Sequence, residues 1–160
     1  MTVGGKRARF TPASIGAFRG LHSLRFTRYS QLDDGSLAST VRCSPGLHAL
    51  TLAAGGSVTD TGLACLALAA PRLRELVLLA EDHPRLRGGS LRLFNALRTL
   101  DLDCCPAVTV DSLVSVLVAC PYLLDLRLPL KLERELSQRI PVRAAAWDEP
   151  GTRPWRGSRH

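Results

Sequence analysis

Leucines recur through the middle of this chain in the pattern Leu-x-x-Leu-x-Leu, whose last two leucines enclose one residue of another kind. Such alternation predicts a short β-strand, because successive side chains of a strand point to opposite faces. The pattern occurs four times in full and once with phenylalanine in the last place: Leu21-Leu24-Phe26, Leu47-Leu50-Leu52, Leu73-Leu76-Leu78, Leu97-Leu100-Leu102 and Leu123-Leu126-Leu128. We therefore expect five short strands, each with one apolar face.

The first leucines of these five units are 26, 26, 24 and 26 residues apart. A fixed period of this size indicates a repeat architecture, in which a unit buries its apolar face only by stacking on its neighbours. The pattern predicts an α/β solenoid over residues 21–140. It would be an arc of about five strand–helix repeats with parallel strands on its concave face.

The connections between the strands have helical character. Val58-Thr59-Asp60 and Val108-Thr109 each place a polar N-cap before apolar residues that are three and four apart, and Leu32-Asp33-Asp34 is a weaker copy. Proline two residues before a strand's first leucine would end the preceding helix, since proline lacks an amide hydrogen. This position is held by Pro45, Pro71 and Pro121.

One connection departs from this scheme. Residues 81–95 are two residues short and contain Pro84, Gly88 and Gly89, so a loop or a short irregular helix is expected there.

The two ends of the chain differ from its middle. Leu132, Leu136 and Ile140 recur four residues apart among charged residues, which predicts a capping helix over 130–140 that closes the stack. Residues 1–20 form a basic segment, read either as a cap or as disordered. Residues 141–160 are rich in Ala, Pro, Gly and Arg, and this composition predicts a disordered basic tail.

Several accessory positions agree with a known family. The chain has a 26-residue repeat with this leucine pattern, the pair Cys120-Pro121 before a strand, Cys105 three residues after a last leucine, and a Val-Thr helix start. In these features it resembles the cysteine-containing leucine-rich-repeat family over roughly residues 20–130. The resemblance implies a ribonuclease-inhibitor-like arc. The repeat is similar to that of F-box/LRR proteins, in which it holds the substrate of a cullin-type ubiquitin ligase. It implies a substrate-recognition or adaptor role, with subunits of such a ligase as partners.

In such an arc the strand residues between the leucines face the concave side. Small and apolar residues occupy the middle of this face, namely Ala49, Ala53, Val77 and Leu79. Val77 and Leu79 beside the small residues would form a modest apolar patch of the kind that interfaces use at their centres. Three aspartates gather toward the C-terminal end and favour a protein partner with a basic segment. The candidate partner-binding residues are Arg25, Thr51, Glu75, Val77, Leu79, Asp101, Asp103, Asp125 and Arg127. The alternative is that they are ordinary solvated positions of a structural repeat.

The net charge of +7 raises the question of nucleic acid, since cationic surfaces release counterions from phosphates. The basic residues are interleaved with Asp and Glu in the middle of the chain, and the excess lies at its ends. We therefore do not expect nucleic acid on the concave face. An RNA-associated protein that uses its basic ends stays a third hypothesis.

The first 20 residues contain no acid and have the composition of a mitochondrial transit segment. The second hypothesis is thus a mitochondrial assembly or coupling factor with the same repeats. The first hypothesis, an adaptor, places the protein in the cytoplasm or nucleus.

The sequence disfavours an enzyme. The five cysteines form no Cys-x-x-Cys pair and the four histidines lie far apart in sequence, so the chain has no zinc signature. The chain contains no run of 18 apolar residues, so we expect no membrane insertion. As a pair of catalytic acids, Asp101 and Asp103 would lack an enclosing pocket. As a nucleophile, Cys104 or Cys105 would lack a neighbouring base. The glycine pairs at 55–56 and 88–89 are interpreted as turn residues. We expect a binding scaffold without a cofactor or metal.

Overall fold

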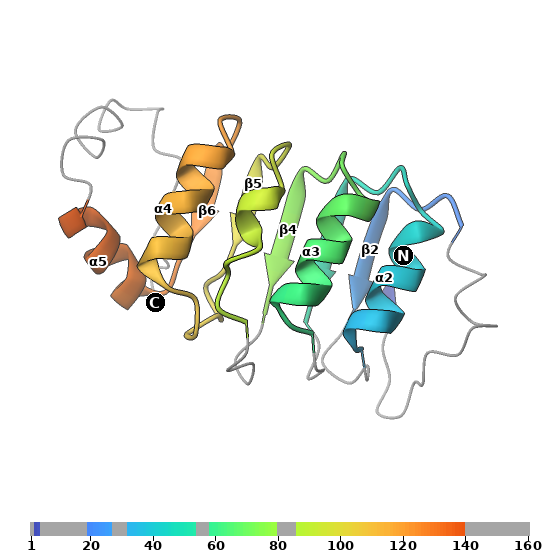
Figure 1. Ribbon diagram of the computed structural model, residues 1–160, viewed down its shortest axis with the longest axis horizontal. Helices are drawn as coiled ribbons and strands as arrows, with labels where there is room; N and C mark the ends of the chain where they lie inside the picture. Colours follow the sequence, from blue (N-terminus) through green and yellow to red (C-terminus); the bar gives the residue numbers. More distant parts are fainter. Residues whose placement is uncertain (1, 4–18, 27–31, 54–57, 80–85, 140–160) are drawn as a thin grey trace.

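The computed structural model describes residues 2–3, 19–26, 32–53, 58–79 and 86–139. The protein belongs to the α/β class, with a parallel sheet whose strands alternate with helices along the chain (Figure 1). Each strand pairs in parallel with the next one in the sequence. The strands are β1 (Thr2–Val3), β2 (Ser23–Phe26), β3 (Ala49–Leu52), β4 (Glu75–Leu78), β5 (Thr99–Asp101) and β6 (Asp125–Arg127).

Helices connect these strands on one side of the sheet. Figure 1 shows α2 (Asp34–Arg42), α3 (Asp60–Ala69) and α4 (Val110–Ala119) side by side in front of the sheet, and α5 (Leu130–Arg139) at its end beside β6. Among the described residues between β4 and β5, 79 and 86–98, the chain forms a 3-10 helix, η2 (Leu91–Leu93), which contacts α3 and α4. The arrangement is compatible with the predicted solenoid.

The predicted elements agree with the structure where it describes them. The five strands, the three connecting helices, the irregular third connection and the capping helix are all present. Strand β1 was not predicted, since two residues are too short for any alternation to show. Some predictions fall on residues outside the described ranges: the basic segment apart from 2–3 and 19–20, the glycines at 55–56, residues 81–85 and the tail from Ile140 onward.

The leucines of the repeat form the core. Leu24, Leu50, Leu76, Leu100 and Leu126 are in register on successive strands, and each is at most 1% exposed. They and the buried residues of the helices form one continuous cluster. Full burial of one such side chain contributes about 1.5–3 kcal/mol to the free energy of unfolding. This row of leucines is therefore a main source of the attraction between neighbouring units.

Equivalent residues start the three helices that connect strands. Asp33, Thr59 and Thr109 are the N-caps of α2, α3 and α4, and the side chain of each accepts a hydrogen bond from a backbone amide of the first turn. The hydrogen bonds from Ser36 lower the pKa of the Asp33 carboxyl. Pro71 follows the C-cap residue of α3 directly, as predicted for a helix stop. These are the caps that the sequence pattern predicted.

Carboxylates link each helix start to the next unit. The Asp34 carboxylate accepts hydrogen bonds from the Thr59 amide (2.8 Å) and from its hydroxyl (2.6 Å). In the following unit, Asp60 accepts from the amides of Arg87 and Gly88, both at 3.0 Å. Gly88 has a φ of +83°, which a residue with a Cβ rarely adopts, so this turn requires glycine.

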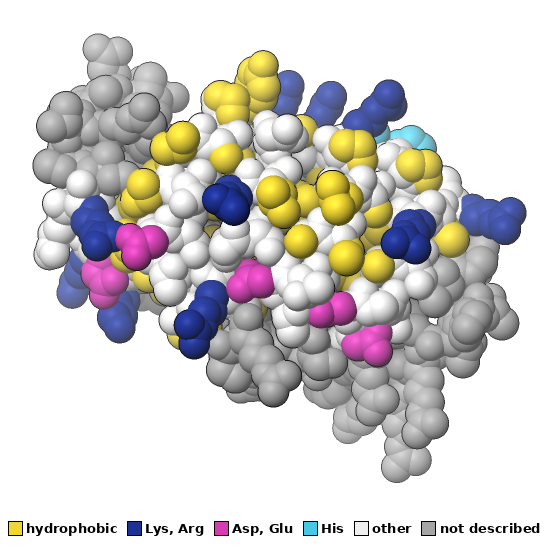
Figure 2. Space-filling model, viewed as in Figure 1, with side chains coloured by type: hydrophobic (Ala, Val, Ile, Leu, Met, Phe, Trp, Pro, Cys, Tyr) yellow, Lys and Arg dark blue, Asp and Glu magenta, His cyan; other side chains and the backbone are white. Residues whose placement is uncertain are grey.

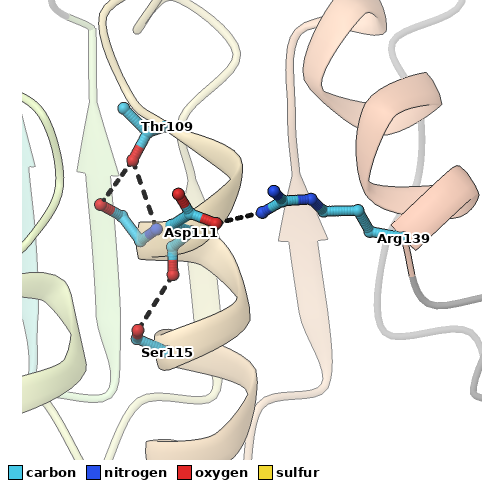
Figure 3. Close-up of polar contacts among 5 residues, drawn as sticks. Thr109, Asp111, Ser115 and Arg139 are labelled. Atoms are coloured by element: carbon cyan, nitrogen blue, oxygen red, sulfur yellow. Dashed lines mark hydrogen bonds and ion pairs between the residues drawn. The ribbon is translucent and has the colours of Figure 1, made fainter.

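The closing helix α5 is held by apolar contacts and one ion pair. Leu132 and Leu136 are buried against the core. Figure 3 shows Arg139 of α5 reaching the carboxylate of Asp111 at the start of α4. Because both side chains of this pair are more than half exposed, the pair adds less than about 1 kcal/mol. The two leucines are therefore the main attachment of α5.

The contact between Asp34 and α3 gives a first prediction. A methyl group at Gly62 would overlap the Asp34 carboxylate. We expect Gly62→Ala to lower the free energy of unfolding by about 1–2 kcal/mol, because Asp34 must leave Thr59. In an Asp34→Ala background, Gly62→Ala should instead raise the free energy of unfolding by up to about 1 kcal/mol, because alanine favours a helix more than glycine does. Urea denaturation of the four proteins measures both effects.

Gly35→Ala is the matched control, because a methyl group there meets only Asp33 at an ordinary 3.7 Å. An equal effect of Gly62→Ala in both backgrounds would show that the Asp34 contact does not form in solution.

Candidate functional site

The strand side chains that point away from the helices form two rows across the sheet. In a parallel sheet neighbouring strands are about 4.8 Å apart, so residues 24–26 apart in sequence become neighbours within a row. The upstream row is Ser23, Ala49, Glu75, Thr99 and Asp125, and the central row is Arg25, Thr51, Val77, Asp101 and Arg127. We call these two rows, with Leu79 and Asp103 just after the strands, the sheet face.

All nine candidate residues lie on the sheet face. Seven of them belong to the two rows, while Leu79 and Asp103 follow β4 and β5. The structure therefore brings together residues that span more than 100 positions of the sequence. Arg25, Glu75 and Arg127 are exposed, and the other six are half-buried.

The expected apolar patch is smaller than predicted. Val77 and Leu79 are half-buried rather than exposed, and Ala53 is buried. Val77 stands between Thr51 and Asp101 on the adjacent strands, whose side chains cover its flanks. The sheet face thus has a narrow apolar centre within a polar surface.

Arg127 lies beside two of the aspartates at the C-terminal end of the sheet face. The Arg127 guanidinium lies 3.6 Å from the Asp101 carboxylate and 4.0 Å from that of Asp125. Asp101 also accepts a hydrogen bond from the Asp103 amide at 3.1 Å, and its side chain is only 14% exposed. Two of the three carboxylates are therefore engaged within the chain, so the surface that would meet a basic partner is less acidic than the sequence suggested.

Cys105, one of the two cysteines considered as nucleophiles, and Cys120 make structural contacts. The Cys105 thiol is buried and donates to the Leu78 carbonyl at 3.1 Å, and the buried Cys120 thiol donates to the Phe94 carbonyl at 3.2 Å. Burial raises the pKa of the Cys120 thiol to about 11. Both thiols link one unit to the preceding one.

The sequence interpretation missed a histidine pair. The rings of His22 and His48 are stacked with centroids 5.7 Å apart and planes within 2°. They are 26 residues apart, so the period of the repeat was the signal that could have found them. The pair lies just before β2 and β3 and outside the two rows of the sheet face.

Over the described residues, no group of three or more His, Cys, Asp or Glu side chains is arranged to hold a metal ion. Within the same ranges, no helix combines the length and apolarity needed to cross a membrane. No protein-family model matches the chain, and no curated protein matches it either.

The Arg127 contacts give a second prediction. Arg127→Gln should change the free energy of unfolding by less than about 1 kcal/mol, because the side chain is half exposed. It should strengthen binding of an oligoarginine peptide severalfold at low salt, since Asp101 and Asp125 then lack their neighbouring cation. Isothermal titration calorimetry measures the affinity. Arg25→Gln removes the same charge from the other end of the row and should change the peptide affinity less. Equal effects of the two substitutions on the affinity would argue against a local acidic site.

The buried thiols give a third prediction. In the native protein at pH 8, iodoacetamide should label Cys120 far more slowly than Cys43 or Cys65, which are half-buried. A pKa of about 11 leaves little thiolate at that pH, and burial restricts access as well. Mass spectrometry of peptides after timed labelling reports each rate, and unfolding in urea should remove the difference. Rapid labelling of native Cys120 would contradict the packing described here.

Proposed function

We propose that this protein is a leucine-rich-repeat scaffold that binds another protein on its sheet face. The observation that carries the proposal is the register of the strands, which aligns Arg25, Thr51, Val77, Asp101 and Arg127 in one row across five strands. A row of this kind offers a continuous surface about four strand spacings long, roughly 19 Å. The helices lie on the other face of the sheet, which supports this choice (Figure 1).

The chemistry of the row fits a protein partner. Its centre is Val77, and charged side chains stand at both ends, which corresponds to the apolar core and polar rim of interfaces. The partner segment would place an acidic group near the exposed Arg25 and a basic group near Asp103 and Asp125. A catalytic role has little support, because the candidate groups lie on an open strand surface and the thiol of Cys105 is buried.

The resemblance to the repeat of F-box/LRR proteins makes the proposal more specific. It supports a substrate-recognition or adaptor subunit that acts with a cullin-type ubiquitin ligase in the cytoplasm or nucleus. This step rests on the resemblance and on fold-level analogy. A mitochondrial assembly or coupling factor is the second candidate, and the absence of acids from residues 1–20 favours it.

Affinity purification with mass spectrometry tests the proposal. The test variant combines Val77→Ser, Asp101→Asn and Asp103→Asn, and a variant with Arg134→Ser and Gln138→Ala on the exposed side of α5 is the control. We expect the wild type and the control to retain the same partners, and the test variant to lose them. Thermal melts followed by circular dichroism verify that both variants fold.

The identity of the partners decides between the candidates. Cullin-ligase subunits would support the adaptor, and respiratory-complex subunits would support the mitochondrial factor. If the folded test variant retains every partner, the sheet face is not the binding surface.

A further inference from the structure

The edge of the molecule where helices end and strands begin has an unusual charge. It comprises residues 19–22, 39–48, 66–74, 91–98 and 116–124, which we call the helix-to-strand edge. These segments contain no aspartate or glutamate. They contain six arginines and two histidines: Arg19, His22, Arg42, His48, Arg72, Arg74, Arg92 and Arg98. Figure 2 shows arginine and histidine side chains along its upper margin, and the acidic ones lower.

The backbone arranges part of this edge as a regular row. The amide of His48 donates to the carbonyl of His22, that of Arg74 to His48, that of Arg98 to Arg74 and that of Leu124 to Arg98, all at 2.8 Å. Equivalent side chains on successive units are therefore about one strand spacing apart. The stacked rings of His22 and His48 begin this row.

Exposed apolar side chains lie on the same edge. Among the described residues, six large hydrophobic side chains are exposed, and all except Leu130 belong to the helix-to-strand edge. The five are Leu68 (82% exposed), Leu93 (46%), Val118 (72%), Tyr122 (65%) and Leu124 (67%). Apolar groups beside arginines also project from the upper margin in Figure 2.

Helix electrostatics explains only half of this composition. The C-terminal end of a helix carries partial negative charge, which favours arginine and disfavours acids there. That effect gives no reason to expose Leu68 on α3 and Val118 on α4, at equivalent positions near the helix ends. Exposed apolar side chains that gather on one edge among charges are typical of interaction surfaces.

We propose that the helix-to-strand edge is a second binding surface, which takes an acidic, leucine-containing segment of a partner protein. Arginine and tyrosine are enriched at the centres of protein interfaces, whereas lysine, aspartate and glutamate are depleted. The edge has this composition, since both lysines of the chain lie elsewhere. Single-stranded nucleic acid would instead need several aromatic platforms. Among the described residues of the edge, Tyr122 is the one exposed side chain of the Phe, Tyr and Trp class, and the exposed ring of His22 is stacked on His48.

The distribution of these side chains sets the direction of the segment. Positive charge lies over β2 to β5, while Tyr122 and Leu124 stand before β6. Acidic residues of the partner would face His48, Arg74 and Arg98, and its leucines would pack on the last unit. The row from His22 to Leu124 spans four strand spacings, about 19 Å, which an extended segment of about six residues covers.

A fluorescent peptide tests the proposal. The probe has four glutamates, a Ser-Gly spacer and two leucines, and its binding to the full chain is followed by fluorescence anisotropy. Arg74→Ser with Arg98→Ser, and separately Tyr122→Ser with Leu124→Ser, should each weaken binding at least about fivefold. All four side chains are exposed, so the variants should keep the wild-type melting temperature.

The matched control is Arg25→Ser with Arg127→Ser, which removes two charges from the sheet face. It should leave binding of the probe within about twofold, as should the Val77, Asp101 and Asp103 variant, so this test is independent of the proposed function. Equal losses in control and edge variants would overturn the proposal. So would failure of the folded wild type to bind the probe.

The same proteins are mixed with phosphatidylserine vesicles and with poly-uridine RNA. Under the proposal both bind more weakly than the peptide at physiological salt. If the vesicles or the RNA bind more tightly than the peptide, and this binding depends on Arg74 and Arg98, the edge binds a membrane or RNA rather than a protein segment. That result would overturn the proposal.

Discussion

No single unit of this chain can bury its own leucines, and the rest of the structure depends on that constraint. A strand of three or four residues exposes its apolar face unless equivalent strands lie on both sides. Leu50 and Leu76 are covered because Leu24 and Leu100 lie beside them in register. Within the described residues β6 has a strand on one side only, and α5 closes that end of the core with Leu132 and Leu136. Polar contacts such as those of Asp34 and Cys120 fix the register within this apolar frame.

The elements that sequence predicted best were those that repeat. The leucine spacing located five strands, and the polar residues at 33, 59 and 109 located the helix starts, since each signal occurred several times at one period. Strand β1 carries no such signal. The rows of the sheet face were also predictable, because alternation alone decides which strand residues point away from the core. Their exposure was not, since it depends on the side chains of neighbouring strands, as at Val77.

The distribution of charge in space does not follow from the order of charged residues along the chain. Along the chain, basic residues in the middle are interleaved with acids. A repeat of 24–26 residues returns each segment to the same edge, so charges that alternate in sequence are separated in space. Asp60 at a helix start and Arg72 after the helix end illustrate this. Comparison of equivalent positions would also have paired Arg127 with Asp101 and His22 with His48.

Among the described residues, charge is separated across the width of the sheet, with arginines on the helix-to-strand edge and Asp34, Asp60 and Asp111 at the opposite edge, where the helices begin. At physiological ionic strength such a field extends about 8 Å from the surface, which is enough to turn a small protein during the last stage of a diffusive encounter. An acidic body would then be attracted preferentially to the edge of Arg74 and Arg98. The sheet face, perpendicular to that edge, would be left accessible, so the order of two binding events could be set by long-range attraction before any contact forms.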